Sequence, residues 1–151
     1  MTTASTNDNA QSGHRMPTYQ ALAHDIKNLG VECVFGLMSD DTALFATEID
    51  TIGIPFIGGR HENNAIAMAE GYSSSTGRLG IAIIGRGPAA ANGLHAAVSA
   101  SRTGSKVLII YGEMPVGGGA VNTIGPDYKA FNASGVLAAA GLQTFSPRSP
   151  Q

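Results

Sequence analysis

The stretch that decides the fold is GGRHENNAIAMAEGY, residues 58–72. It follows the apolar run IPFI at residues 54–57, which predicts a short buried strand, and its two glycines allow the chain to turn. Apolar residues then recur at helical spacing, at Ala65, Met68, Ala69 and Tyr72. The stretch therefore predicts a strand, a tight turn and a helix over residues 62–76. Glu62 falls in the first turn of that helix, at the edge of a parallel sheet where ligands bind.

Glu62 has two interpretations at this point. An acidic residue in the first turn of a helix complements the helix dipole, and that structural role alone accounts for many such residues. A catalytic or ligand-binding role is the alternative. The pair His61-Glu62 does not indicate a zinc protease, because that motif needs a second histidine four residues after the first and this chain has Ala65 there.

Working outward, short apolar runs alternate with segments of helical periodicity. Strands are predicted over residues 32–35, 54–57, 79–84, 106–111 and 141–145. Helices are predicted over residues 19–29, 42–50, 62–76 and 89–102, with weaker helical stretches in 126–140. Strict alternation with short connections predicts an α/β fold, a three-layer, doubly wound parallel sheet of about five to six strands with helices on both faces.

Length and composition restrict the class of protein. A chain of 151 residues corresponds to one domain, and we expect residues 1–17, which are mostly polar, to be a flexible leader before a domain over 18–151. A formal net charge of -2 and few aromatic residues argue against nucleic-acid binding, and no apolar run is long enough to span a membrane. Cys33 is the single cysteine, which favours a reducing, cytoplasmic location. The last predicted strand has no helix after it, so we expect the domain to be truncated or completed by a partner.

Four loops are predicted to meet at the carboxyl edge of the sheet, and two of them carry motifs. Asp40 and Asp41 follow the first strand, where Asp41 is expected to cap the next helix and the alternative is contact with a substrate or metal. Gly85-Arg86-Gly87-Pro88-Ala89-Ala90 fits G-x-G-x-x-A between a strand and a helix. With Glu113 at the end of the next strand, it gives a dinucleotide-binding alternative that uses Gly85 and Gly87.

Several motifs together resemble the pyrimidine-binding, N-terminal domain of thiamine-diphosphate-dependent enzymes, in particular the acetolactate synthase-like branch. The motifs are GVECVFG at 30–36, RHENNA at 60–65, MAEGY at 68–72, Thr76-Gly77, Gly87-Pro88 and Asn92-Gly93. The resemblance implies that Glu62 is the catalytic carboxyl, which hydrogen-bonds a ring nitrogen of the cofactor's aminopyrimidine and favours the imino tautomer that forms the ylid.

By the same resemblance, further residues acquire expected roles. The cofactor-binding residues would be Gly36, Leu37, Met38, Glu62, Gly87, Pro88 and Asn92. The substrate-side residues would be Asp40, Asp41 and Arg86. The resemblance implies no metal ligand in this chain.

The resemblance also implies partners. Such enzymes carry a second domain whose Gly-Asp-Gly motif and downstream Asn bind Mg²⁺ and the diphosphate of thiamine diphosphate, and this chain has no Gly-Asp-Gly. We therefore expect a lyase or transferase acting on 2-oxo acids or aldehydes, active as a homo-oligomer (dimer or tetramer), with this domain inactive alone. A non-catalytic association domain is the remaining alternative.

Overall fold

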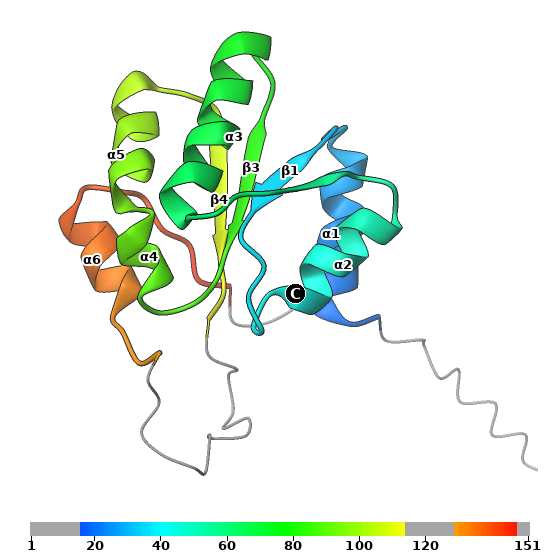
Figure 1. The fold of residues 1–151 in the computed structure, drawn as a ribbon, viewed down its shortest axis with the longest axis horizontal. Coiled ribbons are helices and arrows are strands. Elements are labelled where there is room, and N and C mark those ends of the chain that lie inside the picture. Colours follow the sequence, from blue (N-terminus) through cyan, green and yellow to red (C-terminus); the bar gives the residue numbers. More distant parts are fainter. Residues whose placement is uncertain (1–15, 114–128, 148–151) are drawn as a thin grey trace, which may run out of the picture.

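A parallel four-stranded sheet forms the centre of the molecule (Figure 1). The computed structural model describes residues 16–113 and 129–147, so nearly all of the predicted leader lies outside the described residues. The strands are β1 (Val34–Gly36), β2 (Phe56–Gly58), β3 (Gly80–Ile84) and β4 (Val107–Tyr111), in the spatial order β2-β1-β3-β4. All three pairings are parallel, which confirms the predicted α/β fold.

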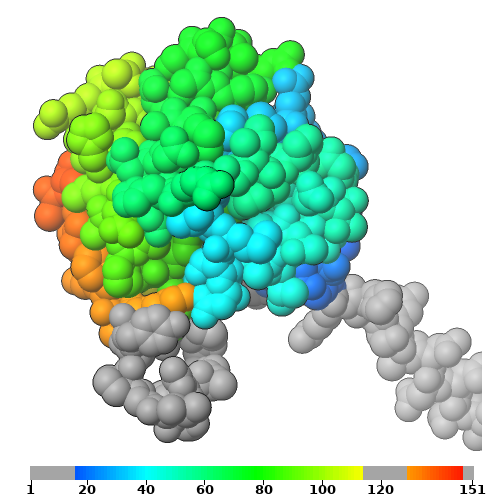
Figure 2. Space-filling model, in the orientation of Figure 1, coloured from blue at the N-terminus to red at the C-terminus, as the bar shows by residue number. Residues whose placement is uncertain are grey.

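Helices cover both faces of the sheet (Figure 1). The described helices are α1 (Thr18–Asn28), α2 (Ala43–Thr51), α3 (Glu62–Thr76), α4 (Ala89–Asn92), α5 (Leu94–Thr103) and α6 (Ala133–Ala139). One face packs against α1 and α2, and the other packs against α3 and α5. Figure 2 shows α6, in orange, at the surface beside α4, with which it is in contact. No helix in the described part of the chain is long and apolar enough to cross a membrane.

The central strand β3 divides the core into two layers. Ile81 and Ile83 point to the layer built on α1 and α2, whereas Ala82 and Ile84 point to the layer built on α3 and α5. All of these side chains are fully buried, as expected for a strand whose successive side chains alternate between two covered faces. The nearly continuous apolar run of the sequence is thus explained by burial on both sides.

The predicted fifth strand, over residues 141–145, is wrong. Its first residues instead close helix α6: Gly141 has φ +78°, its N–H donates to Ala138, and the N–H of Leu142 donates to Leu137 at 3.0 Å. Such a left-handed turn satisfies the last carbonyls of a helix. The segment that follows is exposed, with Phe145 81% accessible, and it pairs with none of the described strands. The described residues therefore contain four strands where about five to six were expected.

The other boundaries agree within two residues, with two larger differences. One is α6, which begins at Ala133 although weaker helical stretches were predicted over residues 126–140, of which 126–128 lie outside the described residues. Helix α3 begins at Glu62 and ends before Gly77, which takes the left-handed conformation (φ +71°) that stops a helix. The single helix predicted over residues 89–102 is divided by Gly93 into α4 and α5. The division places Asn92 at a helix end rather than in a helix interior.

Tyr111, the last residue of β4, carries a buried hydroxyl that has no hydrogen-bond partner among residues 16–113 and 129–147. Burial raises the pKa of Tyr111 to about 12. Because the unfolded chain ionises this group near pH 10, its contribution to stability is complete below pH 10 and is lost as the pH rises toward about 12. Replacing Tyr111 with phenylalanine removes an unsatisfied polar group, so we expect stability at pH 7 to change by less than about 1 kcal/mol, toward greater stability.

Two measurements check this prediction. Urea denaturation at pH 7 gives the change in the free energy of unfolding, and the phenolate absorbance gives the titration. Tyr111→Phe should remove the absorbance change near pH 12 that arises from ionisation of the Tyr111 hydroxyl. A loss of more than about 2 kcal/mol would show instead that the hydroxyl is satisfied in the native protein.

Candidate functional site

The candidate site lies between the parallel strands β1 and β3, where the order in which strands are added to the sheet reverses. From β1 the chain leads to α2 on one face of the sheet, whereas from β3 it leads to α4 and α5 on the other. In the sheet register Gly36 is opposite both Gly58 and Ile83, so the ends of three neighbouring strands lie side by side. A crevice at such a reversal is the usual ligand site of open α/β sheets.

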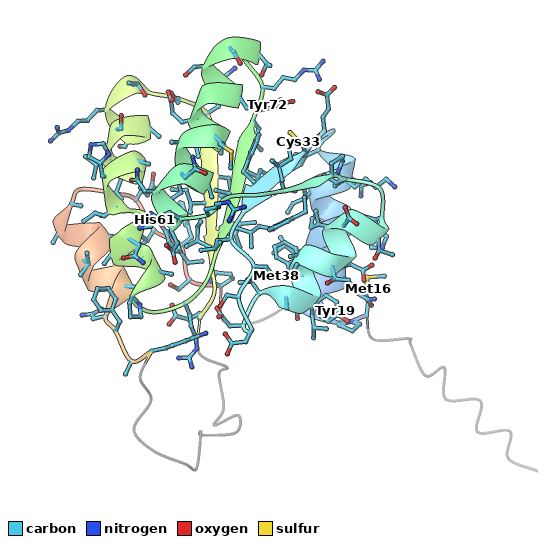
Figure 3. All side chains as sticks on the ribbon, viewed as in Figure 1. Met16, Tyr19, Cys33, Met38, His61 and Tyr72 are labelled. Atoms are coloured by element: carbon cyan, nitrogen blue, oxygen red, sulfur yellow. The ribbon has the colours of Figure 1, made fainter. Side chains whose placement is uncertain are left out.

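Glu62 lies at this edge, in the first turn of α3. His61 caps the helix, its Nδ1 accepting the Asn63 backbone N–H at 3.2 Å, and the extended backbone of His61 fixes where the helix starts. Figure 3 shows His61 at this point, on the α3 side of the sheet. The Glu62 side chain is half-buried, and its Oε2 accepts a hydrogen bond from the Asn92 amide Nδ2 at 3.1 Å. Its Oε1 has no hydrogen bond within the described residues.

Asn92 reaches Glu62 because the helix is interrupted directly after it. Gly93 is buried, and a Cβ added there would lie 2.6 Å from Ile66 Cδ1 and 3.7 Å from Glu62 Cβ. A side chain at position 93 would meet the end of Ile66, so glycine allows the α4–α5 junction to approach α3 this closely. The interruption therefore has a packing cause, which helical periodicity in the sequence does not reveal.

The loop after β1 supplies the opposite wall. Gly36 has no room for a side chain, since a Cβ would lie 2.6 Å from the Phe56 ring and 2.7 Å from the Ile83 carbonyl oxygen. The Leu37 N–H donates to that same carbonyl at 3.3 Å, which extends the pairing with β3 by one residue. Met38 follows with 57% of its surface exposed, and Figure 3 shows it in the loop that leads away from β1.

Asp41 does not cap α2, contrary to the expectation from sequence. The N-cap of α2 is Thr42, which makes no side-chain cap. The Asp41 carboxylate instead bridges two loops: its Oδ2 accepts the Arg86 backbone N–H at 2.7 Å, and its Oδ1 accepts from Lys129 Nζ at 3.1 Å and from the Ser39 hydroxyl. The side chain is only 12% exposed. Asp41 thus fastens the loop after β1 to the loop after β3.

Asp40 differs from its neighbour in exposure. Its side chain is 71% exposed, and it forms an ion pair with Lys129. The hydrogen bond from Lys129 lowers the pKa of Asp40 to about 2, so Asp40 is ionised at neutral pH. Two adjacent carboxylates thus have separate environments, one covered and bonded within the loops, the other facing outward.

Lys129 is the residue that the sequence analysis missed. Its side chain is 15% exposed and contacts both Asp40 and Asp41, across sequence separations of 89 and 88 residues. It precedes α6 in a stretch with no strong periodicity. No local pattern in the sequence could have indicated these contacts.

The turn after β3 is filled by the chain itself. Gly87 has φ +70°, and a Cβ there would lie 2.2 Å from the Lys129 carbonyl oxygen. The Arg86 N–H is bonded to Asp41, and Glu113 is exposed. A dinucleotide fingerprint needs a bare glycine backbone open to a pyrophosphate, and the backbone of Lys129 occupies that side of Gly87. The geometry does not favour the dinucleotide alternative.

The predicted residues therefore gather into two groups at one edge of the sheet. Glu62 and Asn92 form the first, on the α3 side. Asp40, Asp41 and the backbone of Arg86 form the second, together with Lys129. Gly36, at the end of β1, pairs with Gly58 of β2 and Ile83 of β3 at the same edge.

Comparison with known proteins identifies the class to which this fold and site belong. The family described as "Thiamine pyrophosphate enzyme, N-terminal TPP binding domain" matches residues 16–140. The chain belongs to this family, as the N-terminal domain that binds thiamine pyrophosphate, which is thiamine diphosphate under its other name.

Similarity to individual proteins agrees with this family assignment. The acetolactate synthase large subunit of Haemophilus influenzae is 32% identical over 96 residues, which are 63% of this chain and 17% of that protein. The acetolactate synthase large subunit of Lactococcus lactis is 31% identical over 96 residues, and a thiamine pyrophosphate-containing protein of Bacillus subtilis is 30% identical over 111 residues, 72% of this chain and 18% of that one. The chain thus spans less than a fifth of the length of these relatives.

A solved structure shares the fold. A protein of Mycobacterium smegmatis, described as a thiamin diphosphate-dependent enzyme, superimposes with a TM-score of 0.60 at 22% identity, over 67% of this chain and 20% of that one. At this identity the likeness concerns the fold alone.

Proposed function

We propose that this domain holds the aminopyrimidine ring of thiamine diphosphate in a lyase or transferase acting on 2-oxo acids or aldehydes, and that Glu62 is its catalytic carboxyl. Membership of the thiamine pyrophosphate family supports the cofactor. The names of the relatives, acetolactate synthases and a probable 2-ketoarginine decarboxylase, support 2-oxo acids as the substrate class.

One observation carries the proposal. Glu62 presents a half-buried carboxylate at the sheet edge, and the Asn92 amide holds one of its two oxygens. The other oxygen, Oε1, accepts no hydrogen bond from the part of the chain that the structure describes, and it would accept a hydrogen bond from, or donate one to, a heterocyclic nitrogen. A carboxyl fixed through one oxygen can hold or transfer a proton through the other, which is what general acid–base catalysis requires. The residues present thus fit the aminopyrimidine of the cofactor.

The remaining residues of the proposed cofactor site would contribute mostly backbone atoms. Gly36, Leu37 and Met38 would border the ring on the β1 side, and Gly87, Pro88 and Asn92 would border it on the β3 side. When bound, thiamine diphosphate supplies the carbon nucleophile for chemistry at a carbonyl group. The protein's part is to orient the ring and to move a proton at Glu62.

The substrate side is assigned to the second group. Asp40 and Arg86 are proposed to face the substrate. Asp41, whose oxygens are bonded to the Arg86 backbone, Ser39 and Lys129, would act there by holding the Arg86 loop in place.

The proposal includes partners. Glu62 is half-buried and Asn92 is exposed in this domain alone, so another domain must cover them to exclude water from the reaction. We propose that a diphosphate-binding domain of the same or another subunit does so and binds Mg²⁺, that the enzyme is a homo-oligomer in the cytoplasm, and that this domain is inactive alone.

Calorimetric titration of the complete apoenzyme tests the function. With Mg²⁺ present, thiamine diphosphate should bind saturably, whereas nicotinamide and flavin dinucleotides should not. Tight binding of a dinucleotide would contradict the proposal and favour the fingerprint at Gly85 and Gly87. Oligomer formation without any response to thiamine diphosphate would contradict it in favour of the association domain.

A further inference from the structure

Glu62 and the residue after it both reach across to the α4–α5 junction. While Glu62 bonds Asn92, the Asn63 side-chain Oδ1 accepts the backbone N–H of Ala96 at 2.8 Å. The two acceptors are adjacent in α3, and the two donors are four residues apart, one helical turn. These bonds join the first turn of α3 to the end of α4 and to the first turn of α5.

The hydrogen bond from the Ala96 N–H to Asn63 takes the place of a side-chain N-cap for α5. Ala96 is the third residue of α5, so its N–H is one of the donors that a helix N-terminus leaves unsatisfied. The N-cap position is Gly93, which has no side chain to accept it. Ala96 is 5% exposed, so water is largely excluded. Asn63 therefore caps α5 from a different helix.

Asn63 is itself held in place. Its backbone N–H donates to His61 Nδ1, and its side chain is half-buried. Next to this bond, the bare Gly93 packs against Ile66. Through the contacts of Asn63 and Gly93, α3 fixes the junction from which the Asn92 amide extends toward Glu62.

We infer that Asn63 is a positioning residue for the Glu62–Asn92 pair: its bond to Ala96 sets the α4–α5 junction so that the Asn92 amide meets Glu62 Oε2. The inference rests on the proposed function of Glu62. Without the Asn63 acceptor, the first turn of α5 loses its cap, the junction gains freedom, and Asn92 no longer holds the carboxylate in one orientation.

The test compares Asn63→Ala, Asn63→Asp and Asn64→Ala. Asn63→Ala removes the acceptor of the Ala96 N–H. Asn63→Asp retains an oxygen at the same place and should therefore preserve this hydrogen bond. Asn64→Ala is the matched control, because Asn64 is the exposed neighbour and no hydrogen bond of its side chain is found in the described part.

Two readouts are needed. The first is the pair of Asn92 side-chain amide resonances in the cofactor-free 151-residue chain, assigned by ¹⁵N NMR. Asn63→Ala should shift and broaden them, whereas the other two variants should not. The second is exchange of the cofactor's C2 proton in the complete holoenzyme, which Asn63→Ala should slow about 10-fold while cofactor affinity changes little, since misplacement affects the reacting geometry first.

The outcomes distinguish the positioning role of Asn63 from the proposed function of Glu62. Unchanged Asn92 resonances in a folded Asn63→Ala protein would overturn the positioning role, whatever the activity. Shifted resonances with unchanged proton exchange, together with a normal rate in Glu62→Gln, would retain the geometric role and reject the proposed function. If Asn63→Ala does not fold, hydrogen exchange of the Ala96 N–H in the unmodified chain decides: protection is expected, and exchange at the rate of an unstructured amide would overturn the inference.

Discussion

Replacing Glu62 with glutamine is expected to slow exchange of the C2 proton of bound thiamine diphosphate by about 10³-fold in the complete holoenzyme. Glutamine keeps the shape of the side chain and can still accept a hydrogen bond from Asn92. It cannot hold or release a proton, however, and proton transfer at the cofactor's ring is the role proposed for this carboxyl. The exchange rate is measured by proton NMR after rapid mixing with deuterated buffer and acid quenching.

The same variant should remain folded. Glu62 is the acidic residue in the first turn of α3, so neutralising it removes a favourable interaction with the helix dipole worth about 0.3–1 kcal/mol. A large loss of activity with so small a loss of stability separates catalysis from structure.

Glu70→Gln is the matched control for this prediction. Glu70 lies on the same helix, and its Oε1 accepts hydrogen bonds from the Ser74 and Ser105 hydroxyls. Those bonds, chiefly the one from Ser74, lower the pKa of Glu70, so Glu70 is ionised at neutral pH. Glu70→Gln should leave proton exchange unchanged. If Glu62→Gln also exchanged at the normal rate, the role assigned to Glu62 would be wrong.

Replacing Gly80 with alanine is expected to destabilise the domain by about 3 kcal/mol. Gly80 begins β3 beneath α3, and a Cβ there would lie 2.1 Å from the Ala69 carbonyl oxygen and 2.8 Å from its carbonyl carbon. Both atoms are backbone, so a rotamer change cannot relieve the clash and the whole helix must move away from the sheet. Urea denaturation of the 151-residue chain should show a lower midpoint with an unchanged m value.

Gly71→Ala, on the helix that Gly80 supports, should have the opposite effect. Nothing lies within 4 Å of a Cβ at Gly71, which is inside α3 and does not have a positive φ. Alanine is favoured over glycine in a helix interior by about 1 kcal/mol, so this variant should be more stable than the unmodified chain. Equal effects of the two substitutions would contradict the close packing of α3 on β3.

Much of the fold could be predicted from the sequence, because its signals are local. The helical spacing after Gly59, the apolar run of β3 and the glycine at position 77 each specify an element through interactions within a few residues. The alternation of strand and helix then restricts the topology to a parallel sheet with its loops at one edge. The prediction was wrong for residues 141–145, where the capping of α6 took precedence over a short apolar run.

The geometry of the site, unlike the fold, could not be predicted from local signals in the sequence. The sequence placed Glu62 at a strand end and in a first helical turn, and its resemblance to a known family supplied a role. Which groups meet there depends on contacts across 30 residues for Glu62 with Asn92, 45 for Asp41 with Arg86, and 88 for Asp41 with Lys129. Only the folded chain brings such groups within hydrogen-bonding distance.

By itself, the sequence thus determined the α/β class, the position of Glu62 and the edge of the sheet at which the candidate site lies. The tertiary structure alone decided that Gly93 divides a helix, that Asp41 joins the loops after β1 and β3 instead of capping α2, and that Asn63 caps α5 from α3. The physical reason is that helix and strand periodicity arise from neighbouring residues, whereas close backbone approach and the satisfaction of buried polar groups are settled only when distant elements pack together.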